Sequence, residues 1–139
     1  MSSIASLYLL REPDVQALAE SSLAPEHLEL RDVFHWSGYF MMYLLDFLDE
    51  QGVPVSESRY DGDLADLEGL HYVLTTEHQA YLPQLEPAAF DQESFGEYLD
   101  GMGWDDFDEA PIAVAETLRL LREQVAALTG DQALLIDIG

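Results

Sequence analysis

The sequence predicts a single α+β domain, residues 1–139, in which a small sheet includes the N- and C-terminal strands. A long central helix and a long C-terminal helix are expected to pack on this sheet. Three observations predict this class: apolar runs stand near both ends of the chain, helical spacings lie between them, and 48% of the residues are hydrophobic. A chain of 139 residues is long enough to fold around one core without a stabilising disulfide or metal ion.

The first third of the chain predicts a strand followed by a short helix. Residues 3–10, "SIASLYLL", form an apolar run typical of a strand. Pro13 and Asp14 suit the first turn of a helix over 14–23. Residues 24–32, "APEHLELRD", predict a turn or a single helical turn.

The central helix is expected to begin after Asp32, which suits an N-cap, and to stop at Gly52. Its sequence over 33–51 is apolar on nearly every side, which is typical of a buried helix. The predicted core face consists of Trp36, Phe40, Tyr43, Leu44 and Phe47.

The middle of the chain alternates turns with short elements. Residues 53–69 are rich in turn formers and acids, with room for a short helix over 63–68. Residues 70–74, "LHYVL", predict a short strand, and the threonines that follow suit the start of a helix. Asp91 is the predicted N-cap of a helix that ends near Asp100.

The last third predicts a long helix and a closing strand. The helix covers 111–129, with Pro111 in its first turn and Gly130 as its stop. Residues 133–138, "ALLIDI", predict a strand that is expected to neighbour the first strand in one small sheet.

Charge limits the function classes. The chain has 28 acidic residues against five arginines and no lysine, and its net charge is −23. Such a field disfavours nucleic acid, which is bound by neutralising phosphates, and it disfavours an anionic membrane surface. It favours encounter with a basic protein, although acidity also serves solubility or reflects the composition of the host.

Composition also bears on compartment and cofactor. The chain has no cysteine, so disulfides, zinc–thiolate sites and thiol catalysis are excluded. The N-terminal stretch lacks the basic region of a signal peptide, and the longest apolar run, "YFMMYLLDFL", is too short to cross a bilayer. We therefore expect a soluble cytoplasmic protein.

The stretch "GMGWDDFDEAP", residues 101–111, places four carboxylates and a tryptophan before the C-terminal helix. Carboxylates beside Pro111 favour the positive end of the helix dipole, which explains two of the four. Tryptophan is over-represented at binding hot spots. The predicted partner-binding residues are Trp104, Asp105, Asp106, Asp108 and Glu109.

No metal, cofactor or catalytic residue is predicted. "DGDLADLEGLHY" begins like a calcium loop but has Asp66 at the sixth position and Tyr72 at the twelfth. The histidines show neither HxxxH nor HExxH spacing, and no nucleophile motif occurs. The sequence favours a non-catalytic role and leaves enzymatic activity open.

A second group of residues defines an alternative hypothesis. If the central helix packs on the 70–74 strand, aromatic rings and two histidines would line a pocket. Such a pocket would bind a small molecule or serve as an active site. The same residues would equally form an aromatic core with polar tips at its edge. The pocket candidates are His35, Trp36, Tyr39, Tyr43, His71 and Tyr72.

The order of several segments resembles the YfbM-like family of small bacterial proteins of unknown function. These segments are "SIASLYLLREPDVQALAE", "FHWSGYFMMYLL", "YVLTTEHQAYL" and "FDQESF", followed by the Trp/acidic loop, a long helix and "ALLIDIG". The match is best over residues 70–139 and the first twenty, and "LLDFLDE" stands where the family usually has Leu-Thr-Gly. The resemblance implies an α+β fold and a cytoplasmic bacterial protein, and it carries no catalytic residues.

Three functional hypotheses follow from the sequence. The first is a non-catalytic interaction protein that binds a basic partner, as an immunity protein or a mimic of nucleic-acid charge does. The second is a small-molecule or enzymatic pocket of aromatic and histidine side chains. The third is a homodimer built on the apolar surface of the 33–51 helix.

Overall fold

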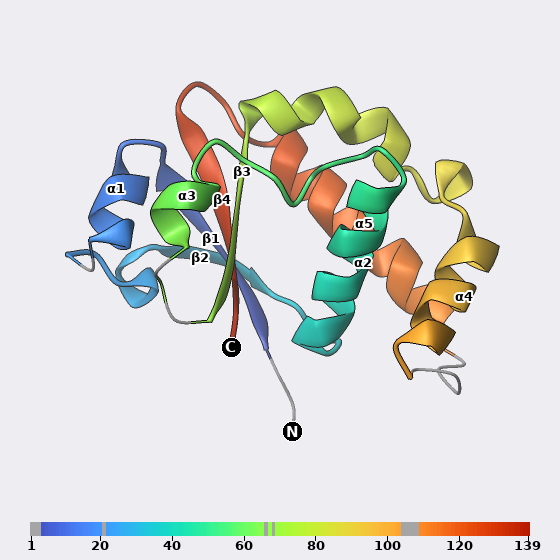
Figure 1. Cartoon of the computed structure of the whole chain (residues 1–139). Helices are drawn as coiled ribbons and strands as arrows, with labels where there is room; N and C mark the ends of the chain where they lie inside the picture. The colour runs from blue at the N-terminus through green and yellow to red at the C-terminus, as the bar shows by residue number, and fades with distance from the viewer. Residues whose placement is uncertain (1–3, 21, 66, 68, 104–108) are drawn as a thin grey trace.

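The structure of this chain is a computed structural model, and it describes residues 4–20, 22–65, 67, 69–103 and 109–139. The described residues form an α+β domain around a four-stranded antiparallel sheet (Figure 1). The predicted fold class is therefore confirmed. Along the sheet the strands are β2 (Glu29–Val33), β1 (Ala5–Arg11), β4 (Gln132–Ile138) and β3 (Leu70–Thr75).

The two terminal strands are neighbours in one sheet, as the sequence predicted, and they form its centre. β1 pairs with β4 over its whole length, from Ala5 opposite Ile138 to Arg11 opposite Gln132. Successive side chains point to opposite faces of the sheet, and apolar residues stand at both sets of positions in β1 and β4, so each strand supplies residues to both faces. Two cores result, one on each face.

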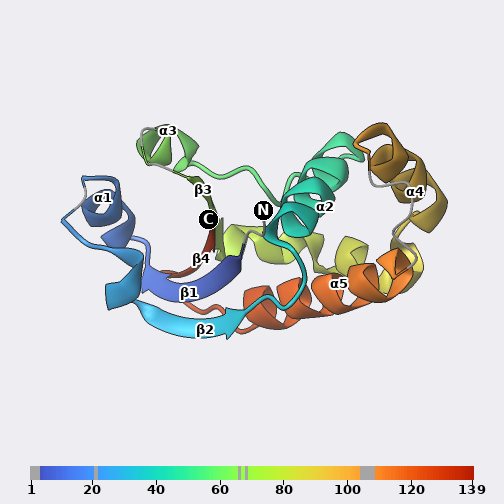
Figure 2. The same ribbon diagram turned by 90° about the horizontal axis from the view of Figure 1, so that it is seen from below.

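Helices cover the two faces unequally (Figure 2). The larger core lies under the long helices, and the smaller core lies under two short ones. On the larger side are α2 (Gly38–Glu50), α4 (Gln92–Gly101) and α5 (Ala110–Ala126); on the smaller side are α1 (Asp14–Ala19) and α3 (Asp61–Leu64). Three 3₁₀ segments complete the described chain: Pro25–His27, Thr76–Leu85 and Pro87–Ala89.

The larger core is closed by aromatic rings carried by α2, α4 and the segment before α4. Phe40 meets Phe95 edge to face with ring centroids 5.7 Å apart, and Phe47 meets Phe90 in the same way at 5.6 Å. Such tilted pairs let the positive ring edge approach the negative ring face. Of the predicted core face, Phe40, Leu44 and Phe47 are buried on α2. Tyr43 is only partly buried, and Trp36, also partly buried, precedes the helix.

The predicted start of the central helix is wrong. Val33 still belongs to β2, and the Phe34 N–H donates to the Ala5 carbonyl oxygen at 2.9 Å, which keeps the chain on the sheet. The helix begins at Gly38, where the Ser37 hydroxyl accepts a bond from the Tyr39 N–H. Val33 and Phe34 are β-branched and aromatic residues, which favour strands. Pairing with β1 therefore outweighs the helical spacing of their apolar side chains.

Other boundaries agree with the sequence. Gly52 follows α2 with φ of 84°, a left-handed conformation that favours glycine and ends the helix. The Asp91 carboxylate accepts from the Ser94 N–H at 3.0 Å and caps α4. By contrast, α1 ends at Ala19 and is shorter than the predicted helix over 14–23.

Substitution of Leu134 by alanine tests the central strands. Leu134 is fully buried in the larger core, so we expect L134A to lower the free energy of unfolding by about 2–5 kcal/mol. I112A, which truncates a side chain 58% exposed on α5, should change it by less than about 0.5 kcal/mol. Urea unfolding followed by circular dichroism measures both values, and equal effects would contradict the assigned core.

Candidate functional site

The structure describes one of the predicted partner-binding residues. Glu109 is exposed at the N-cap position of α5, where its side chain makes no capping hydrogen bond. Its negative charge still lies at the positive end of the helix dipole. Trp104, Asp105, Asp106 and Asp108 lie outside the described residues.

The six predicted pocket residues do not meet in one cavity. His35 and Trp36 contact α5, Tyr72 faces the larger core, and His71 faces the opposite side of the sheet, against Asp137. Two of the six belong to α2: Tyr39, which is 38% exposed, and Tyr43, which packs at the edge of the larger core.

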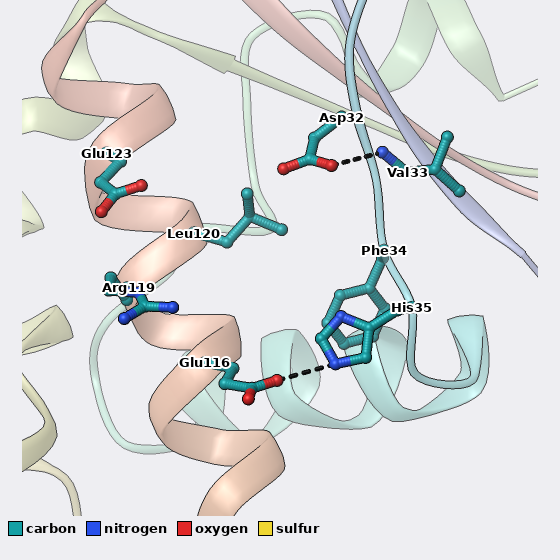
Figure 3. A pocket seen from close by; sticks show the side chains of 8 residues that line it. All are labelled: Asp32, Val33, Phe34, His35, Glu116, Arg119, Leu120 and Glu123. Atoms are coloured by element: carbon teal, nitrogen blue, oxygen red, sulfur yellow. Dashed lines mark hydrogen bonds and ion pairs between the residues drawn. The ribbon is translucent and has the colours of Figure 1, made fainter.

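His35 lines a different hollow, which lies between the end of β2 and one face of α5 (Figure 3). Its volume is about 200 Å³. We call it the β2–α5 groove. The residues that line it are Asp32, Val33, Phe34, His35, Glu116, Arg119, Leu120 and Glu123.

Glu116 fixes the lower part of the groove. One oxygen of its carboxylate, Oε2, lies 2.8 Å from His35 Nε2 and accepts the Trp36 indole N–H at 2.7 Å. Both contacts join the chain after β2 to a helix 80 residues further on. Hydrogen bonds to an ionised carboxylate are stronger than neutral ones, so this oxygen pins the segment after β2 against α5.

Asp32 forms the strand side of the groove. Phe34 N–H points to β1, so the Val33 N–H points away from the sheet, and the Asp32 carboxylate accepts it at 2.8 Å. The carboxylate thereby occupies a donor on the open edge of β2, which is a common way to protect an edge strand. Figure 3 shows the Asp32 and Leu120 side chains pointing toward each other across the hollow.

Most of the arginines form ion pairs with acidic side chains of the same chain. Arg119 lies in the groove, and no described carboxylate lies within 4.0 Å of its guanidinium. The other four arginines each have a carboxylate partner: Arg11 with Asp131, Arg31 with Glu29, Arg59 with Glu12, and Arg122 with Glu86. The groove therefore holds three carboxylates against one arginine and one histidine.

A second set of acids lies beside tyrosines at the edge of the larger core. Burial, together with Asp46 and Asp61, raises the pKa of Tyr72 to about 12. Burial and then the nearby Asp46 and Glu50 raise the pKa of Tyr98. Partial burial, followed by repulsion from Asp49 and Glu50, raises the pKa of Asp46 itself. In all three side chains desolvation is the main cause of the raised pKa, and the nearby carboxylates add to it.

The groove residues were not predicted from the sequence, with the exception of His35. The signal was present, because Glu116, Arg119, Leu120 and Glu123 follow helical spacing and form one face of α5. The outer face of an amphipathic helix is normally solvated, and only the tertiary position of β2 turns it into a groove.

Two kinds of feature are absent from the described residues. No group of three or more histidine and acidic side chains within them is arranged to hold a metal ion. Within the same part of the chain, no helix is long and apolar enough to cross a membrane. Carboxylates beside apolar side chains offer hydrogen-bond acceptors to ammonium and guanidinium groups.

Comparisons with known proteins found no match to this chain among protein-family models, curated proteins or solved structures. The resemblance to the YfbM-like family stays a prediction.

Replacement of Glu116 tests its role as a tie. E116A leaves the partly buried Trp36 indole without this acceptor, and we expect a loss of about 1–3 kcal/mol in the free energy of unfolding. E116Q keeps an acceptor oxygen and should lose less. E123A, at an exposed position on the same helix, is the control for truncation. Equal stability of E116A and E123A in urea would contradict the tie.

Asp46 tests the cost of a carboxylate that is partly desolvated and lies near two other acids. Its pKa is raised in the folded protein, so its ionised form destabilises the fold at neutral pH. D46N should raise the melting temperature at pH 7 more than E97Q, which removes one exposed charge from α4. The difference should vanish as the pH falls through 3.8, the ordinary value, because the carboxyl is then protonated in both states. A gain that persists below that pH would contradict it.

Proposed function

We propose that this protein is a non-catalytic interaction protein that binds a basic partner, and that the β2–α5 groove receives an arginine or lysine side chain of that partner. The observation that carries the proposal is the pairing of charges. Four arginines are held in ion pairs with the chain's own acids, while the groove presents the three carboxylates of Asp32, Glu116 and Glu123 against the single guanidinium of Arg119.

The geometry of Glu116 supports a guanidinium or ammonium guest. Both intramolecular donors bind Oε2, and among the described residues none donates to Oε1. A carboxylate has lone pairs for several donors, so the second oxygen is available to an incoming cation. Because His35 and Trp36 already orient the carboxylate, little ordering is needed on binding.

The apolar lining supports a side chain with a long stem. Val33 and Leu120 flank the carboxylates, and Val33 is 47% exposed. Arginine and lysine bury their methylene stems on apolar surface while the charged group reaches acceptors. An anionic guest would meet the field of a chain with net charge −23, which disfavours phosphates.

A basic macromolecule gains more from this surface than a simple cation does. The long-range electrostatic field accelerates encounter with a positively charged partner. The groove then fixes how the partner is aligned on the surface. An immunity-type protein or a mimic of nucleic-acid charge works in this way. A cytoplasmic location and membership of the YfbM-like family remain proposals that rest on sequence patterns alone.

The homodimer hypothesis receives little support from α2. Most of its apolar side chains, including Met41, Leu44 and Leu45, are buried inside the chain. Little apolar surface of this helix is therefore left for a second copy.

The binding test uses an arginine-rich peptide as the probe, with Trp36 emission as the signal in a W104F background. D32N/E116Q/E123Q removes three groove charges, whereas E93Q/E97Q/D100N removes the same number from exposed positions on α4. We expect the groove variant to weaken binding by about tenfold or more, and the α4 variant by less than about threefold. Binding should also weaken with added salt.

Equal losses in the two variants would show that only the diffuse field binds the peptide, which would contradict the groove. Binding that is insensitive to salt would contradict the electrostatic basis of the whole proposal.

A further inference from the structure

β2 is an edge strand, and its outer side pairs with no other strand of the described chain. It stands first in the order β2-β1-β4-β3, and all five of its residues are exposed. Figure 2 shows β2 at the margin of the protein, with none of the described elements drawn beyond it. An open edge of this kind presents backbone N–H and C=O groups to an extended segment that can pair with it. We call the open side of Glu29–Val33 the β2 edge.

A β-bulge gives the two faces of β2 different chemistry. The pairing with β1 shifts between Leu7 and Tyr8, so Arg31 is an extra residue in the register. In a regular strand Leu30 and Asp32 would share a face, because they are two residues apart. Here they lie on opposite faces. Asp32 is opposite Leu7, which belongs to the larger core, and Leu30 is opposite Tyr8, which packs on the smaller core.

The face of β2 on the side of the larger core is acidic. Glu29 lies opposite Leu9, which packs on the larger core, so its side chain shares this face with Asp32. Arg31 Nη1 lies 3.7 Å from Glu29 Oε2 and offsets part of that charge. No described arginine lies within 4.0 Å of the Asp32 carboxylate. Asp32 is therefore the acid of this strand that remains for a cation, and the carboxylates of α5 lie across the β2–α5 groove from it.

The opposite face of the β2 edge is apolar. Leu30 and Val33 both point to it, and their exposed fractions are 52% and 47%. Ile4 exchanges two backbone hydrogen bonds with Gly139, which continues the pairing of β1 with β4. Alternation from the buried Ala5 puts the Ile4 side chain, 56% exposed, on the same face. Three exposed apolar side chains therefore lie on this one face of the sheet.

Asp32 controls access to one backbone donor of the β2 edge. The Val33 N–H points away from β1, and the Asp32 carboxylate accepts it at 2.8 Å. A segment that pairs with β2 must replace this bond with one to its own carbonyl oxygen. The replacement is unfavourable unless the displaced carboxylate gains another partner. A basic side chain on the same segment supplies that partner, so the edge admits a segment that carries a cation more readily than a neutral one.

We infer that the basic partner adds an extended segment to the β2 edge as a fifth strand, and that apolar and basic residues alternate in this segment. Its basic side chain lies on the face of Asp32 and enters the β2–α5 groove. Its apolar side chains lie beside Leu30 and Val33 on the other face. The inference rests on the proposed function, to which it adds the conformation and the residue order of the partner.

A second copy of this chain fits the β2 edge less well than a basic segment does. Antiparallel pairing of two β2 strands would bring the acidic faces of both copies together, with Glu29 and Asp32 on the same side of the joint sheet. Each copy also carries a net charge of −23, and like charges oppose association. A basic segment meets the same face with the opposite charge.

Two arginine–valine peptides of equal composition test the residue order. In one the two residues alternate, and in the other they stand in separate blocks. Calorimetry gives the affinities, and hydrogen exchange reports the Val33 amide. We expect the alternating peptide to bind at least about tenfold more tightly, because only this order puts basic and apolar side chains on opposite faces of a strand. Exchange of the Val33 amide should slow at saturation, since the N–H then lies between two paired strands.

Backbone methylation separates strand pairing from charge. An added strand turns every second N–H toward β2 and the others toward solvent. The alternating peptide is therefore methylated either at all its valine amides or at all its arginine amides. One of these peptides should bind at least about tenfold more weakly than the parent, and the other should bind within about threefold of it. Equal affinities of the two methylated peptides would show that no strand is added.

Two protein variants test the apolar face. L30S/V33S removes the apolar side chains of the β2 edge, whereas M102S/I112S removes two of similar exposure, 46% and 58%, from elsewhere on the surface. L30S/V33S should weaken the alternating peptide by about tenfold and the block peptide by less than about threefold. M102S/I112S should change neither affinity. Circular dichroism first establishes that each variant is folded.

Failure of the inference differs from failure of the proposed function. If neither peptide binds, or if D32N/E116Q/E123Q binds both as tightly as the parent does, the proposed function fails and the inference with it. If the two peptides bind alike and both depend on the groove charges, the inference alone fails. Sedimentation of the free protein provides the last outcome: self-association that L30S/V33S abolishes would assign the β2 edge to a second copy and overturn the inference.

Discussion

The pairing of β1 with β4 is the constraint on which the rest of this structure depends. It joins the two ends of the chain over seven register pairs, and each strand contributes side chains to both cores. Because β4 is central, it also sets the register of β3 and so places His71 opposite Asp137. Because β1 is central, its free side receives β2, whose last residues form one wall of the β2–α5 groove. The β2–α5 groove thus depends on this long-range pairing for its strand wall, while α5 supplies the opposite wall.

The elements that could be predicted are those whose apolar pattern reflects burial inside the chain. The terminal strands, α4 and α5 all bury regular positions, and their patterns gave the fold class. β2 could not be predicted in this way, because all five of its residues are exposed and no apolar face marks it as a strand. The start of α2 was misplaced for a related reason. Val33 and Phe34 continue the helical spacing of the residues that follow, but Val33 pairs with Ser6 and the Phe34 N–H donates to the Ala5 carbonyl oxygen, which keeps them on the sheet.

The candidate sites show where sequence reasoning stopped short. His71 and Tyr72 were expected in one pocket, yet adjacent residues of a strand face opposite sides, and period-two alternation alone separates them. This error was avoidable. The groove was not predictable in the same sense, since Glu116 acquires its role from contacts with His35 and Trp36, about 80 residues earlier in the chain. A helix face of glutamate, arginine and leucine carries no indication of which strand edge will lie against it.

The distribution of positive charge gives the acidity a structural meaning. Arg11 ties the end of β1 to Asp131 before β4, Arg59 reaches Glu12 across the smaller core side, and Arg122 joins α5 to Glu86. Exposed pairs of this kind stabilise the fold little. Each arginine is nevertheless paired with one acid and is then less available to offset the charge of the other carboxylates. Repulsion between neighbouring carboxylates also acts at Asp46, where Asp49 and Glu50 add to desolvation in raising the pKa. In the proposed binding, a cation near the groove carboxylates would reduce the repulsion between them, and this reduction would contribute to the free energy of binding. The Glu116 carboxylate, which His35 and Trp36 already orient, would favour a cation whose donors can reach it.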